Sequence, residues 1–314
     1  RVPIGSLASV HVVAGGTGGL GLLTARWLAQ HQAVSTLALA SRSGLLARDA
    51  ASEGAGLRTT NVSTLVQRCD TAEDAHIGRL VANAMGIAPT TSVWHAAGVL
   101  ADGVLPRQRA ETCARVYAPK AYGAWALHSA CGTAVVPTYA PFSSVAAAFG
   151  GAGQANYSAA NACLDALATW RRSCALAATS VQWGAWAEVG MATRGAAAER
   201  MAAMEAASGI GRIGLGQGLG ALHTAVLPQA HSLVAVMPVQ WERMLSDGAV
   251  PAFLSNMVVS APTMQHNSAV PAEQRTRCAI SLEAVLGMVR RTAGSTVDAD
   301  APLMEAGVDS LGAV

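Results

Sequence analysis

The feature that most constrains the fold is an apolar segment that leads directly into a glycine-rich turn. Residues 7–13 (LASVHVV) are apolar and rich in valine, which predicts a buried strand. The turn AGGTGGLG follows at 14–21, and Leu20, Leu23 and Trp27 then recur at helical spacing. Strand, glycine turn and helix in this order form the context in which GxGxxG binds a dinucleotide. The alternative for the same glycines is a flexible turn without a ligand.

Each glycine of the pattern has its own role in such a site. Gly16 permits a tight turn, Gly18 lets the backbone approach a pyrophosphate, and Gly21 lets the helix pack closely on the strand. The N-terminus of the helix offers N–H groups and a positive dipole end to the phosphates.

The second predicted strand, at 36–40, indicates which dinucleotide is bound. An NAD-selective site carries an acidic residue at the end of this strand, where it bonds the ribose hydroxyls. Here the strand ends in Ser41, Arg42 and Ser43, and a guanidinium flanked by hydroxyls suits a 2′-phosphate. We therefore predict NADP(H); the alternative for Arg42 is a solvated surface arginine.

Two further strands complete the predicted nucleotide pocket. The strand at 62–67 leads to Asp70, which either accepts a hydrogen bond from the adenine amino group or caps a helix. The strand at 91–95 ends in His95, which we interpret as packed rather than catalytic, and the small Ala97 leaves room for the cofactor. The predicted cofactor-binding residues are Gly15, Gly16, Thr17, Gly18, Gly19, Leu20, Gly21, Ser41, Arg42, Asp70 and Ala97.

The segment FSSVAAAFGGAGQANYSAANACLDALATW at 142–170 carries the groups suited to chemistry. A predicted strand delivers Ser143 and Ser144 at its end, and a glycine turn and a helix follow. Tyr157 and Asn161 are four apart on that helix, so they share a face. A serine, a tyrosine and an amide beside a nucleotide suggest proton delivery to a carbonyl.

Strands and helices alternate along the rest of the chain. Strands are predicted at 135–142, 179–183 and 232–237, and helices at 107–131 and 215–226. This alternation predicts an α/β fold, a doubly wound parallel sheet of the Rossmann type. The helix at 107–131 contains Lys120 among apolar neighbours, and a buried unpaired ammonium is costly, so this lysine requires a reason. The Ala- and Met-rich stretch at 191–208 predicts a mobile flap over a pocket.

Composition narrows the class of protein. The 314 residues carry a net charge of +2 with 13% charged residues and no basic stripe, so nucleic acid is not an expected partner. No apolar run approaches the ~20 residues that a membrane span needs. Six scattered cysteines without metal-binding spacing favour reduced thiols in a cytoplasmic protein and no metal site. The start RVPIGSLASV shows no secretory signal and no initiator Met, so we expect a fragment of a longer polypeptide.

Residues 8–240 resemble the ketoreductase domain of modular polyketide synthases, a branch of the short-chain dehydrogenases/reductases. The matching segments are AGGTGGLG at 14–21, LASRSG at 39–44, WHAAGVLADG at 94–103, APKAYGAWALH at 118–128, FSSVAAAFGGAGQANYSAANACLDALA at 142–168 and SVQWGAWAEVGMA at 180–192. They follow one another in the order and spacing of that family. The ketoreductase of animal-type fatty acid synthases is similar and is the nearest alternative.

The resemblance implies roles for four catalytic residues. Tyr157 is the implied proton donor and Ser144, rather than the adjacent Ser143, bonds the substrate carbonyl. Lys120 and Asn161 complete the set, because synthase ketoreductases take the lysine from the earlier helix and have an amide four residues after the tyrosine. A cation within a few ångström lowers a tyrosine pKa from ~10 by roughly 1–3 units, so we expect Lys120 to make Tyr157 a better acid.

The implied reaction is the NADPH-dependent reduction of a carrier-bound β-ketoacyl thioester to the β-hydroxyacyl thioester. The implied partners are an acyl carrier domain and the other domains of a parent synthase. Asp102 keeps one aspartate of the LDD-like motif of B-type enzymes, although Ala101 replaces the other. Phe149 stands where A-type enzymes have Trp, and Ala159 is not the Pro of epimerising members. We therefore expect B-type, non-epimerising reduction to a D-configured hydroxyl.

The C-terminal residues 303–314 (LMEAGVDSLGAV) resemble the start of an acyl carrier protein. Ser310 would carry 4′-phosphopantetheine; the alternative is an ordinary N-cap serine. We expect a ketoreductase catalytic domain at 1–245, a linker at 246–275 and a truncated carrier domain at 276–314. Two alternatives remain for the function: a stand-alone reductase of small ketones, and an inactive ketoreductase-like scaffold.

Overall fold

The computed structural model describes residues 9–257 except 32–33, 48–50, 89, 133, 191–208, 246–249 and 251. The predicted flap at 191–208, most of the predicted linker and the predicted carrier segment with Ser310 lie outside the described residues. Within the described part, no helix combines the length and apolar character that a membrane crossing requires.

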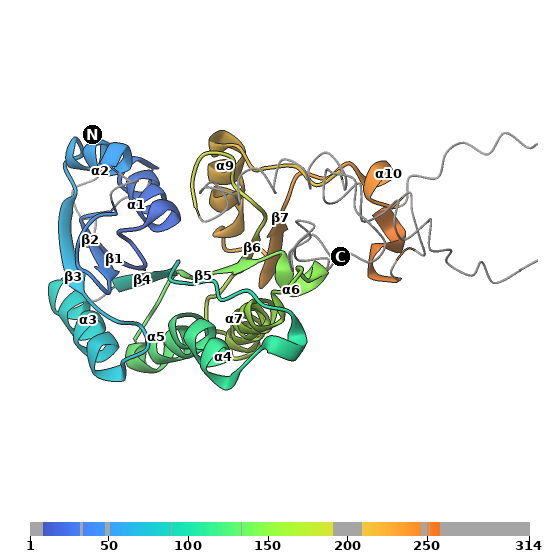
Figure 1. Ribbon diagram of the computed structural model, residues 1–314. Coiled ribbons are helices and arrows are strands. Elements are labelled where there is room, and N and C mark those ends of the chain that lie inside the picture. Colours follow the sequence, from blue (N-terminus) through green and yellow to red (C-terminus); the bar gives the residue numbers. More distant parts are fainter. Residues whose placement is uncertain are drawn as a thin grey trace, which may run out of the picture.

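A parallel sheet of seven strands runs through the described part of the chain (Figure 1). The strands are β1 (Ser9–Ala14), β2 (Thr36–Ser41), β3 (Ser63–Arg68), β4 (Thr90–His95), β5 (Tyr139–Ser144), β6 (Ser180–Trp183) and β7 (Leu233–Val236). Their order is β3-β2-β1-β4-β5-β6-β7, and all neighbouring pairs are parallel. The order reverses between β1 and β4, where ligands of open α/β sheets bind outside the carboxyl ends of the strands. The predicted doubly wound parallel sheet is confirmed.

Helices cover both faces of the sheet. They are α1 (Gly19–His31), α2 (Ala51–Arg58), α3 (Asp74–Ile87), α4 (Ala110–Tyr117), α5 (Gly123–Cys131), α6 (Ala146–Phe149), α7 (Ala155–Ser173), α9 (Leu215–Ala225) and α10 (Trp241–Met244), with short turns η2 (Leu105–Arg107), η3 (Ala118–Tyr122) and η5 (Ala252–Met257). Figure 1 shows α1, α2 and α9 on one face and α3, α4, α5 and α7 on the other.

The core is divided between these two faces because successive side chains of a strand point to opposite sides. On β1, Val12 belongs to the apolar cluster that includes Ile77 of α3. The next residue, Val13, belongs to the cluster that includes Leu22 of α1 and Leu222 of α9. β1, which also contains Ser9 and His11, therefore contributes apolar side chains to both halves of the core, as expected for a strand covered on both sides.

The helix predicted at 107–131 is interrupted in the structure. α4 ends at Tyr117, the π-helical turn η3 covers Ala118–Tyr122, and α5 begins at Gly123. Pro119 lies in η3, where its missing N–H removes an α-helical hydrogen bond. The widened turn carries Lys120 into the interior, where its side chain is 4% exposed.

Candidate active site

The glycine turn after β1 packs against its surroundings in a way that requires glycine at two positions. Gly15 has a φ of +77°, a conformation that favours glycine. A Cβ on Gly21 would lie 2.2 Å from the carbonyl oxygen of Gly15, so any side chain there would separate α1 from the turn. This is the close helix–strand approach that the sequence pattern predicts.

Gly18 differs because its missing side chain leaves open space. A Cβ on Gly18 would meet only the Gly15 carbonyl oxygen, at 3.6 Å. The first turn of a helix also leaves backbone N–H groups without partners in that helix, and α1 begins at Gly19. An open backbone in front of a 13-residue helix fits a pyrophosphate, so the residues present are compatible with a dinucleotide.

The carboxyl ends of β2 and β3 lie next to this turn. Ser41 is the last residue of β2, and its carbonyl oxygen accepts a 2.8 Å hydrogen bond from the amide of Cys69. Arg42 follows it and is exposed. Asp70 Oδ1 accepts a 3.1 Å hydrogen bond from the amide of Ala72. The helix-cap alternative for Asp70 is wrong, because α3 starts at Asp74 with Glu73 as its N-cap.

Two loops approach the glycine turn from the other strands. The amide of Ala97, after β4, would lie 2.7 Å from a Cβ on Gly15. The amide of Gly190, in the loop after β6, would lie 3.2 Å from a Cβ on Gly19. These approaches bring the loops after β1, β4 and β6 together at one edge of the sheet.

The side chain of Lys120 reaches the same edge of the sheet from η3. Its Nζ donates hydrogen bonds to the carbonyl oxygen of Phe142 (2.9 Å) and to Asn161 Oδ1 (2.8 Å). A Cβ on Gly98 would lie 2.8 Å from Lys120 Cε, so a side chain at this position would have to displace the lysine stem. Burial lowers the pKa of Lys120 to about 7, while the charge of Asp165 acts in the opposite direction.

The lysine content of the sequence also points to Lys120. Lys120 is the only lysine of the chain, and the other basic residues among the 21 are arginines. A guanidinium stays charged in proteins, whereas the pKa of a lysine shifts readily on burial. Of the two buried Lys and Arg side chains in the described part of the chain, Lys120 and Arg171, only the lysine can readily lose its charge on burial.

Tyr157 lies on the buried face of α7, next to Lys120. Its side chain is 9% exposed, and Lys120 Nζ lies 5.2 Å from the centre of its ring. The expected lowering of the Tyr157 pKa by Lys120 is not found. Burial raises the pKa of Tyr157, and side-chain hydrogen bonds with Asn161 and Ser144 partly oppose this effect. Burial of the phenol is the largest of the influences on this pKa.

The two serines at the end of β5 have different environments. Ser143 is buried, and its Oγ donates a 3.3 Å hydrogen bond to the Asn161 carbonyl oxygen. Ser144 is partly exposed, and its Oγ accepts a 3.2 Å hydrogen bond from the amide of Ala146. Of the two serines, Ser144 is the one that acts on the pKa of Tyr157, which it lowers.

His95 lies under this group as a packed side chain. It is fully buried at the end of β4, and its Nε2 lies 3.1 Å from the Lys120 carbonyl oxygen. Burial lowers its pKa to about 4. The neutral ring therefore packs against the backbone of η3.

The loop that contains Asp102 is tied to the start of α7. Asp102 Oδ2 accepts a 3.2 Å hydrogen bond from Gln154 Nε2, and the amide of Gly103 donates to the Gly153 carbonyl oxygen at 2.8 Å. Asn156 Nδ2 donates to the Ala101 carbonyl oxygen at 2.8 Å. These hydrogen bonds hold the loop against the start of α7, the helix that also carries Tyr157.

Phe149, the other residue assigned to stereocontrol, is partly buried at the end of α6. Its ring lies 5.9 Å, centre to centre, from the ring of Phe253 in η5. Phe253, like Gln154, Asn156 and Asp165, was not singled out by the sequence motifs. A signal was present for Asp165, because it follows Asn161 by one helical turn.

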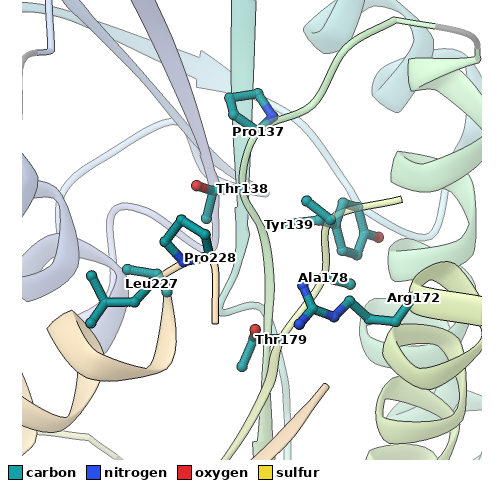
Figure 2. A pocket seen from close by; sticks show the side chains of 10 residues that line it. Pro137, Thr138, Tyr139, Arg172, Ala178, Thr179, Leu227 and Pro228 are labelled. Carbon is teal, nitrogen blue, oxygen red and sulfur yellow. The ribbon is translucent and has the colours of Figure 1, made fainter. Parts of the chain in front are cut away.

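A cavity of about 40 Å³ lies elsewhere, and Figure 2 shows the side chains around it. Tyr139 and Thr179, which line it, are at or just before the amino ends of β5 and β6. Ser144 ends the same β5, and a six-residue strand spans roughly 17 Å. The cavity is thus at the opposite edge of the sheet from Tyr157 and its neighbours.

This fold and this group of side chains define the class of short-chain dehydrogenase/reductase-like oxidoreductases. The KR domain family matches residues 9–188. The chain belongs to this family, the ketoreductase domains of polyketide synthases. The expected ketoreductase class is confirmed, and the family implies NAD(P)H as the cofactor.

The chain covers only part of the length of the proteins to which it is similar. Polyketide synthase GfsB of Streptomyces halstedii is 37% identical over 254 residues, which are 80% of this chain and 4% of that protein. A solved structure of A-type ketoreductases from a modular polyketide synthase has a TM-score of 0.69 and 35% identity, covering 76% of this chain and 49% of that one. A C2-type ketoreductase has a TM-score of 0.65 and 30% identity, covering 77% and 49%.

The chain thus spans about half of these solved chains and a small part of the synthase. Because an A-type and a C2-type enzyme are similar to this chain to nearly the same degree, overall likeness does not establish its stereochemical type.

Proposed function

We propose that the chain uses NADPH to reduce a β-ketoacyl thioester, presented by an acyl carrier domain, to the β-hydroxyacyl thioester. One arrangement carries the proposal. Lys120 Nζ lies 5.2 Å from the Tyr157 ring and donates to Asn161, and the side chains of Asn161 and Ser144 both act to lower the pKa of Tyr157, all at the sheet edge that bears the glycine turn.

NADPH would supply the hydride that the β-carbon of the ketone accepts. Negative charge then develops on the carbonyl oxygen, and donors aimed at this oxygen stabilise the transition state. Ser144, at the partly exposed end of β5, would orient the carbonyl. Tyr157 would give its phenolic proton to the oxygen.

The raised pKa of Tyr157 suits this role in one respect. A phenol with a raised pKa keeps its proton near neutral pH and is available as a donor. After the transfer, the hydrogen bonds with Asn161 and Ser144 would stabilise the phenolate, since these contacts lower the pKa. Burial and hydrogen bonding therefore have opposite effects on the pKa of the phenol that donates the proton.

The preference for NADPH over NADH rests on Arg42. It follows β2, is exposed, and carries a guanidinium that pairs with phosphate oxygens. Ser41, Asp70 and Ala97 lie on the neighbouring strand ends and loop, as expected for residues around an adenosine and a nicotinamide.

The B-type outcome, with a D-configured hydroxyl, rests on Asp102 and Phe149. Asp102 influences the pKa of Tyr157 through its charge, so it lies close to the proposed reaction. Its loop is fixed to the start of α7 by the hydrogen bond from Gln154. Because A-type ketoreductases are similar to this chain, the configuration of the product has to be tested directly.

The carrier assignment rests on sequence resemblance. Ser310 would carry 4′-phosphopantetheine in a carrier domain of 276–314, after a linker at 246–275 and a catalytic domain at 1–245. A partner of this kind suits a synthase, in which the other domains supply the β-ketoacyl group and use the product.

The test is turnover of a β-ketoacyl thioester surrogate, followed by the absorbance of NADPH. We expect Tyr157→Phe to bind NADPH but to lose about 100-fold or more in kcat, because a general acid is removed. Tyr122→Phe is the matched control, since Tyr122 is 63% exposed, and it should keep wild-type turnover. Wild-type turnover in Tyr157→Phe contradicts the proposal, and a wild-type chain without turnover supports the scaffold alternative.

A further inference from the structure

Asp165 is a carboxylate held in place by two hydrogen bonds from β6. Its Oδ1 accepts from Ser180 Oγ at 2.6 Å, and its Oδ2 accepts from Gln182 Nε2 at 2.7 Å. Ser180 and Gln182 are both buried, and alternate positions of a strand point to the same side. The carboxylate is therefore fixed between α7 and the sheet.

Asp165 also lies on the helix that carries the proposed catalytic groups. It follows Asn161 by four residues, so the two side chains are neighbours along one side of α7. Asn161 Oδ1 accepts the hydrogen bond from Lys120, and Asn161 Nδ2 donates to the Tyr157 carbonyl oxygen at 2.8 Å. One helix segment thus links the carboxylate, the amide and the phenol.

Both partners of Asp165 are neutral donors, so its negative charge is not cancelled by these contacts. Burial and the charge of Asp165 are the two influences that shift the pKa of Lys120, and they have opposite signs. Burial alone would favour a neutral amine, because an ammonium in a dry interior loses its hydration. A carboxylate nearby favours the ammonium.

The other titratable groups around Lys120 carry little charge near neutral pH. His95 of β4 is neutral because burial lowers its pKa to about 4. Tyr157 and Cys163 of α7, and Tyr117 of α4, keep their protons near pH 7, because ordinary phenols and thiols titrate at higher pH and the pKa of each of these groups is raised further. The charge of Asp102, in the loop after β4, raises the pKa of Tyr157.

We infer that Asp165 is a positioning residue for the proposed reduction: its carboxylate, anchored by Ser180 and Gln182, keeps Lys120 protonated beside Tyr157. The importance of Asp165 for catalysis depends on the proposed function. Because Lys120 titrates near neutral pH, a modest change in its environment alters its charge where the enzyme would work.

The composition of the chain makes a direct test possible. Lys120 is the only lysine, so incorporation of ¹³C-labelled lysine places one labelled side chain in the full 314-residue protein. Its Cε resonance, followed by NMR against pH, reports the protonation of Lys120 without substrate or turnover. We expect Asp165→Asn to lower the titration midpoint by about 0.5–1 pH unit.

Two companion variants separate charge from anchoring. Gln182→Ala removes one hydrogen bond but keeps the carboxylate, so its midpoint should stay near that of the wild type. The double variant Asp165→Asn/Gln182→Glu exchanges amide and carboxylate across the same hydrogen bond, and should move the midpoint back up. If Asp165→Asn does not fold, Asp165→Ser takes its place, because a hydroxyl can still pair with Ser180.

The pH dependence of kcat provides the second readout. The decrease of kcat at alkaline pH should occur about 0.5–1 pH unit lower in Asp165→Asn than in the wild type. An unchanged or higher Lys120 midpoint in a folded Asp165→Asn or Asp165→Ser variant overturns the inference. A wild-type chain that reduces no β-ketoacyl thioester contradicts the proposed function instead, while the NMR titration still decides whether Asp165 acts on Lys120.

Discussion

Lys120 Nζ donates a 2.8 Å hydrogen bond to Asn161 Oδ1, across 41 positions of the sequence. The contact joins the π-helical turn η3 to the middle of α7. It gives the buried amine a partner, and a second hydrogen bond goes to the Phe142 carbonyl oxygen. The only lysine of the chain is thereby fixed next to Tyr157.

The depressed pKa of Lys120 predicts a specific pH dependence of folding stability. Its folded value is about 7 against 10.5 for an ordinary lysine, so between these values the unfolded chain binds more protons. The penalty for burying the amine is fully present below pH 7 and fades as the pH rises from 7 to about 10.5. Urea denaturation at pH 7 and pH 9.5 should show this rise in the wild type.

Two substitutions at Lys120 isolate that contribution. Lys120→Met has no titrating group, so the part of the pH dependence due to this side chain should disappear. Lys120→Arg stays charged, so its penalty should persist at pH 9.5. Equal slopes of stability against pH in the wild type and Lys120→Met would show that Lys120 is not buried as an amine with a lowered pKa.

The glycine turn predicts that two alanine substitutions have different consequences. Gly21→Ala places a Cβ 2.2 Å from a backbone oxygen and should cost about 1–3 kcal/mol of folding free energy, as overpacking does. Gly18→Ala meets nothing closer than 3.6 Å, so it should fold normally but bind NADPH about tenfold or more weakly. Urea denaturation and fluorescence titration with NADPH measure the two effects, and a Gly18→Ala variant with full affinity would argue against this turn as the pyrophosphate site.

Arg42 predicts the discrimination between the two nicotinamide cofactors. Arg42→Ala should weaken NADPH binding about 10–100-fold, the value of a charge-assisted hydrogen bond to a phosphate, and leave NADH binding unchanged. Arg58→Ala, which removes another exposed arginine at the end of α2, is the control and should change neither. Equal losses for both cofactors would mean that Arg42 does not contact the 2′-phosphate.

The configuration of the product tests the stereochemical proposal. Chiral chromatography of the hydroxyacyl product should give the D configuration from the wild-type chain. Because the hydrogen bond between Gln154 and Asp102 helps to hold the loop, Gln154→Ala should increase the share of the L product. An L product from the wild type would assign the chain to the A type and remove any role of Asp102 as a B-type marker.

The sequence by itself determined the fold class and the positions at which the site is built. The apolar run, the glycine turn and the helix are contiguous, so local pattern was enough to predict β1, the turn and α1. The alternation of strands and helices then predicted the doubly wound sheet, whose carboxyl edge receives Ser144 and the turn for geometric reasons.

Tertiary structure decided what the side chains at these positions experience. The two hydrogen bonds of Lys120 join residues 22 and 41 positions apart, and no local pattern specifies such partners. The pKa of Tyr157 is raised rather than lowered because the phenol is buried. This burial is the sum of contacts from several segments that are distant in the sequence. The proline-containing π turn and the anchoring of Asp165 by β6 depend on the same long-range packing. The sequence therefore determined which groups are present, and packing determined their charge and direction.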